Sequence, residues 1–244
     1  DDFTLTTIVR PEPVVGDQTL TACSDDSLAV SFDASSSVTA ATYTISELDL
    51  GGLTVSGGNA AVADSLFAIN LSNDQFLNDS TTGVLVTYDV YPVSSFGCKG
   101  DMFNVFATIN PEPVGNNSTD TICSNFAFSY DPQDNINAVN SVTSTFTWEI
   151  TAVTGTVSGI ALGDIGTGLV AETIENTTAT AAIVEFTVKP TSDPDGCEGT
   201  PFTITLTINP QPVAADSSYT VCSDESFTYD PQDNVDDNSD GNSV

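Results

Sequence analysis

Cysteine and acidic side chains are the residues of this chain whose types and spacing suggest chemistry. Cys23 and Cys98 are 75 residues apart, and Cys123 and Cys197 are 74 residues apart. The chain has no CxxC pair and no histidine, which disfavours a zinc site. We therefore predict two disulfides, Cys23–Cys98 and Cys123–Cys197, in a protein of an oxidising compartment. The partner of Cys222 is expected beyond the end of this sequence.

Calcium binding by acidic loops is the second chemistry that the sequence suggests. Residues 236–241, DDNSDG, match the pattern D-x-[DN]-x-[DN]-G, in which alternate oxygens converge on a hard cation. Structural Ca²⁺ is the one cofactor expected, with Asp236, Asn238 and Asp240 as ligands. A repeated segment, YDPQDN, supplies weaker candidate ligands: Asp131, Asp134, Asp230 and Asp233. Ordinary Asp-Pro turns and a solvated acidic loop explain both segments without a metal.

Catalysis is not expected from this composition. Without histidine the usual catalytic triad is absent. Glycoside hydrolysis needs two placed carboxylates, and no Asp or Glu pair is singled out by its context. A net charge of −31, from 34 acidic against three basic residues, makes nucleic acid and anionic lipid poor partners. No apolar run approaches the roughly 18 residues of a membrane span, so membrane insertion is not expected either.

The elements that must position these residues repeat along the chain. Residues 84–114, VLVTYDVYPVSSFGCKGDMFNVFATINPEPV, return at residues 183–213 as IVEFTVKPTSDPDGCEGTPFTITLTINPQPV. Each copy contains two alternating strands, a Gly-Cys-x-Gly turn and a Pro-x-Pro-Val joint, with a period of about 100 residues. Because proline fixes φ and extends its predecessor, we expect stiff joints between modules. The joint prolines are Pro11, Pro13, Pro111, Pro113, Pro210 and Pro212.

This pattern predicts an all-β chain of tandem immunoglobulin-like β-sandwich modules. Residues 11–111 and 112–210 are expected to be complete repeats. Residues 1–10 are expected to be the last strand of a preceding repeat, and residues 211–244 the start of a further one, within a longer array. In the first module, strands are predicted at residues 18–22, 28–32, 41–48, 53–56, 66–71, 84–91 and 103–109.

Three kinds of residue are expected to organise each module's interior. Tyr43 and Trp148 are predicted to occupy equivalent places as the large core aromatic, with Trp148 near the disulfide. A carbohydrate-stacking role for Trp148 is the alternative. Asn78 and Asn176 each lie eight residues before a valine of the penultimate strand and are expected to hold the turn into it.

The motifs taken together resemble a known family. An Asn-Thr-Thr turn, VEFTVKP, GCEG, FTITLTINP and PxPV in the second module are similar to the PKD-like (polycystic-kidney-disease-like) repeats of large secreted surface proteins in Bacteroidota. The first module matches with NDS, VTYDVYP, GCKG and FNVFATINP. The usual Trp-Asp-Phe-Gly-Asp-Gly signature is missing, and FTWEIT of the second module stands in its place. The resemblance implies an immunoglobulin-like sandwich, type IX secretion, and a role in adhesins or cell-surface filaments without enzymatic activity.

From these observations we expect a structural and adhesive region of a giant secreted protein, forming a stiff stalk or a multi-chain extracellular filament. Self-association into a homo-oligomeric fibre is the expected partnership, with cell-surface or glycan targets at its end. The alternative function is a carbohydrate-binding or spacer module of a large secreted enzyme.

Overall fold

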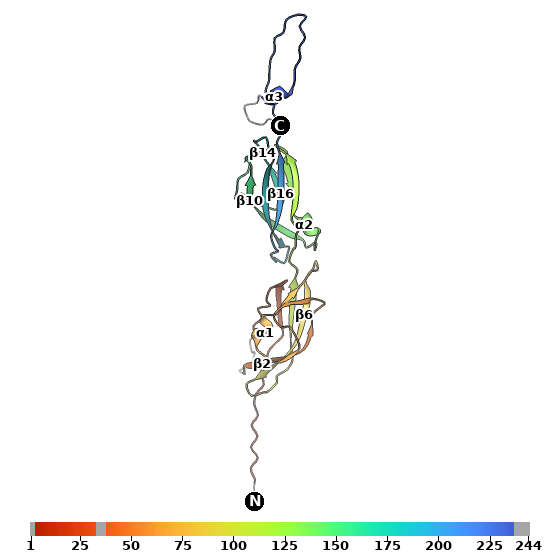
Figure 1. Ribbon diagram of the computed structural model, residues 1–244. Coiled ribbons are helices and arrows are strands. Elements are labelled where there is room, and N and C mark those ends of the chain that lie inside the picture. The colour runs from red at the N-terminus through yellow and green to blue at the C-terminus, as the bar shows by residue number, and fades with distance from the viewer. Residues whose placement is uncertain (1–2, 33–37, 237–244) are drawn as a thin grey trace. The chain divides into compact units, whose positions relative to one another are not determined.

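The structure is a computed structural model that describes residues 3–32 and 38–236. It divides into two compact units, unit 1 (Asp1–Glu112) and unit 2 (Pro113–Val244). The regular elements of both units are almost all strands, so the all-β prediction is confirmed (Figure 1). The units are described separately below.

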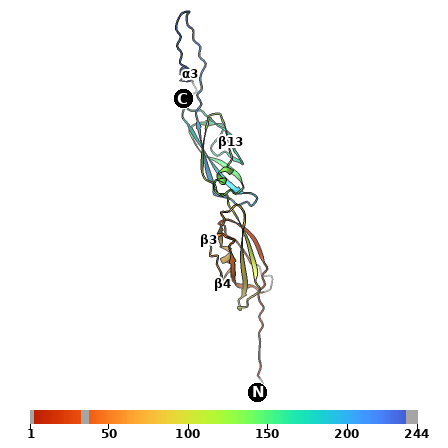
Figure 2. The same ribbon diagram turned by 90° about the vertical axis from the view of Figure 1, so that its right-hand side faces the viewer.

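Unit 1 contains a five-stranded sheet in the order β1-β7-β6-β2-β4 and a two-stranded sheet of β3 and β5. Figure 2 labels β3 and β4 of this unit. A single turn of helix, α1, lies between β4 and β5 in the chain. The bounds are β1 Gln18–Cys23, β2 Ala40–Asp49, β3 Thr54–Gly57, β4 Ala63–Leu66, α1 Ala68–Ser72, β5 Gln75–Leu77, β6 Val84–Ser94 and β7 Phe103–Asn110.

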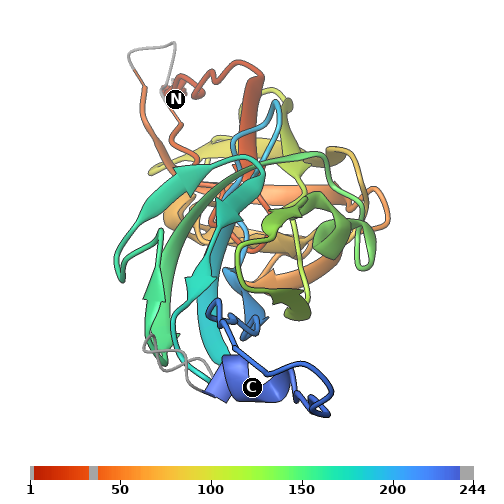
Figure 3. The same cartoon turned by 90° about the horizontal axis from the view of Figure 1, so that it is seen from above.

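Unit 2 repeats this plan with a sheet in the order β12-β10-β15-β16-β8 and two smaller pairs, β11-β14 and β13-β9. Its long strands, in green to blue, are visibly twisted when viewed from above (Figure 3). The bounds are β8 Ser118–Cys123, β9 Ala127–Tyr130, α2 Gln133–Asn137, β10 Ser144–Thr154, β11 Val157–Ser158, β12 Ile165–Thr167, β13 Val170–Thr173, β14 Glu175–Asn176, β15 Ala182–Ser192 and β16 Phe202–Asn209. The described part of the chain ends with α3, Gln232–Asp236.

Alternation of apolar and polar residues explains why the long strands form. Every second residue is buried in both β7 and β16. These side chains join those of β6 and β15 in one hydrophobic cluster per unit. Because side chains alternate between the two faces of a strand, one face of each sheet lines a core while the other stays half-exposed.

The first and last strands of each module lie side by side and run parallel. β1 pairs with β7 over six residues, from Gln18 opposite Val105 to Cys23 opposite Asn110. β8 pairs with β16 in the same way, from Ser118 opposite Ile204 to Cys123 opposite Asn209. The chain therefore enters each module at one end of its main sheet and leaves at the other.

Two predicted strands of unit 1 are wrong. Residues 66–71 form β4's last residue and most of α1, because Asn70 Oδ1 accepts a hydrogen bond from the Phe67 N–H at 2.8 Å and starts a helical turn. Residues 28–32 are in no strand, although Leu28 and Val30 are buried. The left-handed backbone of Ala29, at φ 50°, interrupts the extended conformation there.

The equivalence of Tyr43 and Trp148 is also wrong. Tyr43 lies opposite Pro92, whereas the residue opposite the matching Pro190 is Phe146. Trp148 lies opposite Val188 and so corresponds to Ile45 of unit 1. Both aromatic side chains lie in the cores at 7% exposure, and the Trp148 ring contacts that of Phe186 edge-on, with centroids 5.7 Å apart.

Residues 3–10 follow the apolar pattern of β7 but form no strand. Phe3, Leu5 and Val9 correspond by the period to Phe103, Val105 and Ile109, yet each is more than 80% exposed. A strand needs a neighbouring strand for its hydrogen bonds, and none pairs with this segment among the described residues. Their assignment to a preceding repeat stays a prediction.

Candidate functional site: the two poles of each module

The features that repeat in both units gather at the two ends of each main sheet. We call the end where the chain enters a module the entry pole, which holds the Gly-Cys-x-Gly turn. The end where the chain leaves is the exit pole, which holds the cysteine that ends the first strand. The β6–β7 turn and Cys23 mark these poles in unit 1, and the β15–β16 turn and Cys123 mark them in unit 2.

The predicted Cys23–Cys98 disulfide is wrong because the two cysteines lie at opposite poles of unit 1. Cys23 is opposite Asn110, the last residue of β7. Cys98 lies in the turn before β7, beside the bridge between Val93 and Lys99. The length of β7, at about 3.3 Å per residue, places them more than about 20 Å apart. A disulfide requires Cα atoms within about 7 Å of each other.

The same geometry excludes the predicted Cys123–Cys197 disulfide in unit 2. Cys123 is opposite Asn209 at the exit pole, whereas Cys197 lies in the turn before β16 at the entry pole. Cys23 and Cys197 are the disulfide-bonded cysteines of the chain. Cys98 is a half-buried thiol, and Cys123 and Cys222 are exposed thiols.

Each entry pole is a tight turn that holds the joint against the hairpin. Gly97 and Gly196 have φ of 79° and 77°, which disfavours any residue with a Cβ. Gly100 and Gly199 have a different role: a Cβ there would fall on the carbonyl oxygen of Pro13 or Pro113, the second proline of each joint. The glycines of the Gly-Cys-x-Gly motif therefore serve the turn and the close packing of the joint.

Each exit pole is built around a buried asparagine. Asn176 is fully buried, and its Nδ2 donates hydrogen bonds to the carbonyls of Thr180 at 2.7 Å and Ile208 at 2.9 Å. Its Oδ1 accepts from the Thr178 N–H and hydroxyl, and its own N–H donates to Ser124 Oγ. Asn78 makes the corresponding five hydrogen bonds in unit 1. The turn role expected for these asparagines is thus accompanied by a bond to the last strand.

The YDPQDN segment braces the start of a module in unit 2. Asp131 Oδ1 accepts a hydrogen bond from the Gln133 N–H at 3.0 Å, as expected of an Asp-Pro turn that opens α2. The Tyr130 hydroxyl donates to Asn135 Oδ1, and Asn135 Nδ2 donates to the carbonyl of Asn116 at 2.6 Å. The sequence analysis did not single out Asn135. Its recurrence as Asn234 in the second YDPQDN copy was the signal that could have identified it.

The acidic residues of these segments do not form a cluster in the described part of the chain. Asp230 repeats the turn contact of Asp131, accepting from the Gln232 N–H at 2.9 Å, and Asp134 and Asp233 lie in the first turns of α2 and α3. Among the residues described, no three Asp, Glu, Cys or His side chains are placed to hold a metal ion. Asn238 and Asp240 lie outside the described residues, and Asp236 is the last residue of α3.

Unit 1 also holds a buried acid that the sequence did not reveal. Asp74 is 2% exposed, and its carboxylate accepts hydrogen bonds from the Tyr88 hydroxyl at 2.8 Å and the Asn59 N–H at 3.0 Å. Burial raises the pKa of Asp74, although these two donors partly oppose it. Burial and the neighbouring Asp74 charge also raise the pKa of Tyr88. Phe186 of unit 2 stands at the position of Tyr88, so the pair is specific to unit 1.

Asp74 should make the stability of unit 1 depend on pH. A carboxyl whose pKa is raised by folding contributes stability below its unfolded pKa, near 4, that is lost as pH rises through the folded pKa. Thermal unfolding between pH 4 and 7 should therefore show that the Tm of wild type rises relative to the Tm of Asp74→Asn as the pH falls. Parallel curves would contradict this, and Asp79→Asn, on an exposed loop, is the control.

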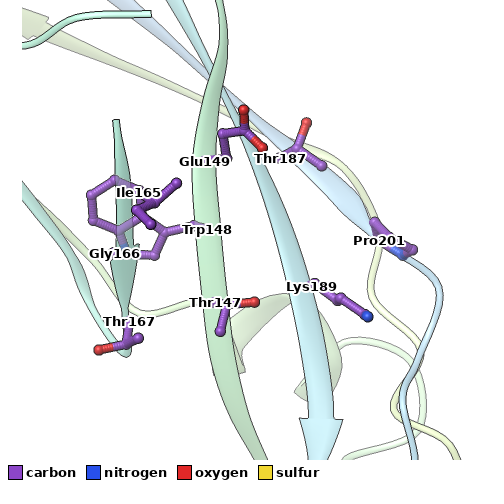
Figure 4. A pocket seen from close by; sticks show the side chains of 9 residues that line it. All are labelled: Thr147, Trp148, Glu149, Ile165, Gly166, Thr167, Thr187, Lys189 and Pro201. Atoms are coloured by element: carbon purple, nitrogen blue, oxygen red, sulfur yellow. The ribbon is translucent and has the colours of Figure 1, made fainter. Parts of the chain in front are cut away.

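Unit 2 has a shallow cleft of about 550 Å³ beside Trp148. Figure 4 shows the indole beside Ile165 and Gly166 of β12, with Lys189 and Pro201 on the other side of the cleft. Trp148 Nε1 is buried without a hydrogen-bond partner among the described residues. A Cβ on Gly166 would fall on the indole, so the ring is covered by β12. Sugar stacking needs an open ring face, which this arrangement does not offer.

The repeated sheets, joints and poles define a tandem array of immunoglobulin-like β-sandwich domains. The chain belongs to the PKD-like domain family, whose model matches residues 20–113 and residues 120–212. This family is one of immunoglobulin-like domains and is not a family of enzymes, in agreement with the fold. No curated protein sequence matches the chain significantly. No helix of the described segments is long and apolar enough to cross a membrane.

Several solved structures are similar to the chain. The fibronectin(III)-like modules of Clostridium thermocellum CbhA are 10% identical, with a TM-score of 0.25, over 85% of this chain and 100% of theirs. Human mucin-like protocadherin EC1-2 is 10% identical, with a TM-score of 0.27, over 82% and 98%. The sialic acid binding region of a Streptococcus sanguinis SK1 adhesin is 8% identical, with a TM-score of 0.25, over 85% and 81%. Similarities this low carry no functional weight.

Proposed function

We propose that this chain is a load-bearing segment of an exported surface protein, part of a stiff stalk or multi-chain extracellular filament used in attachment. The observation that carries the proposal is the parallel pairing of the first and last strands in both modules. Tension applied at the two ends of such a module pulls these strands past each other lengthwise. All the hydrogen bonds of the six-residue ladder then share the load, rather than opening one after another.

Composition supports the same proposal. An acidic surface keeps long arrays soluble and apart, and disulfide bonding is typical of proteins outside the reducing cytoplasm. We also propose export by type IX secretion in a member of the Bacteroidota, because the motifs resemble repeats of large secreted proteins of that group. We further propose that chains associate with one another into a fibre whose tip meets cell-surface or glycan targets.

Calcium is proposed as the ion that offsets the charge of the array. Asp236, Asn238 and Asp240 supply the alternate oxygens of a hard-cation loop in the sequence. Equilibrium dialysis of a chain extended past Val244 should show one Ca²⁺ retained, and an Asp236→Asn/Asp240→Asn double variant should lose it. No retained Ca²⁺ in the extended wild-type chain would refute the calcium proposal and leave the load-bearing role intact.

Electron microscopy of the native full-length protein on the cells that make it tests the function. Antibodies against residues 11–210 should label regular filaments that project from the surface, and a Ca²⁺ chelator should loosen them. Label confined to compact secreted particles, with no filaments, would contradict the proposal. The alternative, a spacer or carbohydrate-binding module of a secreted enzyme, would be favoured by hits above background on a glycan array.

A further inference from the structure

We propose that the outer edge of β1 in unit 1 pairs antiparallel with the β1 edge of a second copy of this chain. The main sheets of the two copies then continue into one another across the contact. The inference rests on the proposed association of chains and names the surface through which it takes place.

β1 is an edge strand whose outer side has no partner strand. It stands first in the sheet order β1-β7-β6-β2-β4, and no strand of the described segments pairs with its other side. Its backbone is extended over six residues, Gln18–Cys23, in a continuous register with β7. The outward N–H and C=O groups of such a strand form a row that another strand can satisfy. The outer side of β1 is therefore a template for an added strand.

The other edges of the two main sheets carry features that discourage pairing. β4 is four residues long, contains Asp64 and pairs with β2 through an irregular register. β12 is only three residues long. β8 is as long as β1, but Asp120 lies in its middle. Short edges, charges and irregular pairing all oppose edge-to-edge association, and β1, with the sequence QTLTAC, has none of these features.

Leu20 and Asp120 occupy equivalent places in the two modules. Leu20 lies opposite Ala107 and Asp120 lies opposite Leu206, each the fifth residue of its strand, β7 or β16. If two β8 strands paired antiparallel about this place, Asp120 would lie opposite Asp120 of the second copy. Like charges directly opposite each other destabilise a strand pair. β1 has a leucine at this place and so permits a pairing that β8 opposes.

An antiparallel pair of β1 strands is self-complementary. A twofold axis at Leu20 places Thr19 of each copy opposite Thr21 of the other. Both threonines are exposed, and opposed threonines stabilise a strand pair through their hydrogen bonds. Leu20, which packs against the core of unit 1, meets its counterpart on the other face of the sheet. Asp17, just before β1, already accepts a hydrogen bond from the Asn104 N–H at 2.8 Å.

The net charge of the chain favours an uncharged edge as the contact. A chain with a net charge of −31 repels its own copies. At physiological ionic strength the screening length is about 8 Å, so charges far from a contact contribute little to this repulsion. Charges directly opposite across a strand pair, about 5 Å apart, still repel each other. Association is therefore favoured where the paired strands carry no charge.

Sedimentation velocity of the full chain tests the pairing, with its thiols alkylated so that no disulfide links the copies. Over a concentration series at physiological ionic strength, wild type should form a dimer. Thr19→Asp/Thr21→Asp sets acid opposite acid twice and should raise the dissociation constant about tenfold or more. Both positions are exposed and the ladder to β7 uses the backbone, so the variant should keep its far-UV circular dichroism spectrum. A wild type that stays monomeric at every concentration would overturn the proposal.

Matched variants identify the edge and its direction. Thr119→Asp/Thr121→Asp, at the equivalent places of β8, should leave the dimer unchanged. Thr19→Lys/Thr21→Asp should keep the dimer, because an antiparallel pair sets the new lysine of each copy opposite the new aspartate of the other. A parallel pair would set like charges opposite each other. Equal weakening by the β8 variant, or loss of the dimer in the Lys/Asp variant, would contradict the antiparallel β1 contact.

The result is separable from that of the electron microscopy. A monomeric wild type in solution, together with filaments on the cells, would refute the β1 contact and leave the proposed function standing. A dimer that depends on β1, without filaments on the cells, would contradict the proposed function and leave the contact standing.

Discussion

Replacing Asn176 by alanine should lower the free energy of unfolding of unit 2 by about 3–5 kcal/mol. The substitution removes a side chain that donates to two carbonyls and accepts from one N–H and one hydroxyl, at a site with no solvent exposure. Each buried polar group left without a partner costs about 1–3 kcal/mol. Urea unfolding in the presence of reductant measures this, with the fluorescence of Trp148 as the signal, because the chain has one tryptophan.

Two variants control for this result. Thr178→Val removes one donor to the Asn176 Oδ1 and should cost only about 1 kcal/mol. Asn78→Ala disrupts the corresponding network of unit 1 and should leave the Trp148 transition in place. If Asn176→Ala cost no more than Thr178→Val, the asparagine would not be the organising group of the exit pole.

Replacing Gly199 by alanine should destabilise unit 2 by about 3 kcal/mol, at the upper end of the range for overpacking. The new methyl group would fall on the Pro113 carbonyl, and a backbone atom cannot move aside as a flexible side chain can. The entry pole would have to open, so the joint should also become more accessible to proteases. The same Trp148 transition measures the loss of stability.

Gly16→Ala is the control for the intrinsic effect of the exchange. No atom lies within 4 Å of a Cβ built on Gly16, so removing a glycine there should be neutral or slightly stabilising. Gly100→Ala should reproduce the Gly199 effect in unit 1 without altering Trp148 fluorescence. Full stability of Gly199→Ala would mean that the joint does not pack against the turn as the structure indicates.

Strands that bury one face could be predicted because their alternation is visible without any neighbour. Residues 84–91 and 103–109 were predicted within a few residues of β6 and β7, and the period extended the prediction to β15 and β16. Residues 66–71 were not, because the choice between strand and helix there depends on one local hydrogen bond from Phe67 to Asn70. Leu28 and Val30 are buried although they belong to no strand. The alternation of apolar residues alone cannot distinguish such a segment from a paired strand.

The cysteine pairing shows what the repeat could not reveal. Equal separations of 75 and 74 residues indicated a constant role for each cysteine but not the pole at which it lies. That position follows from the parallel register of β1 on β7, which places Cys23 beside Asn110 and far from the β6–β7 turn. Equal separations therefore do not by themselves indicate a bond within each module.

Tension applied to the two ends of the chain tests the load-bearing role most directly. In single-molecule pulling with reductant present, we expect two abrupt lengthenings, each of roughly 300 Å, as the β1–β7 and β8–β16 ladders fail. As a control, handles on Leu85 and Thr108 open the antiparallel β6–β7 pair from one end. That geometry should open unit 1 at a clearly lower force. A smooth low-force extension from the chain ends, or equal forces in the two geometries, would contradict the load-bearing role.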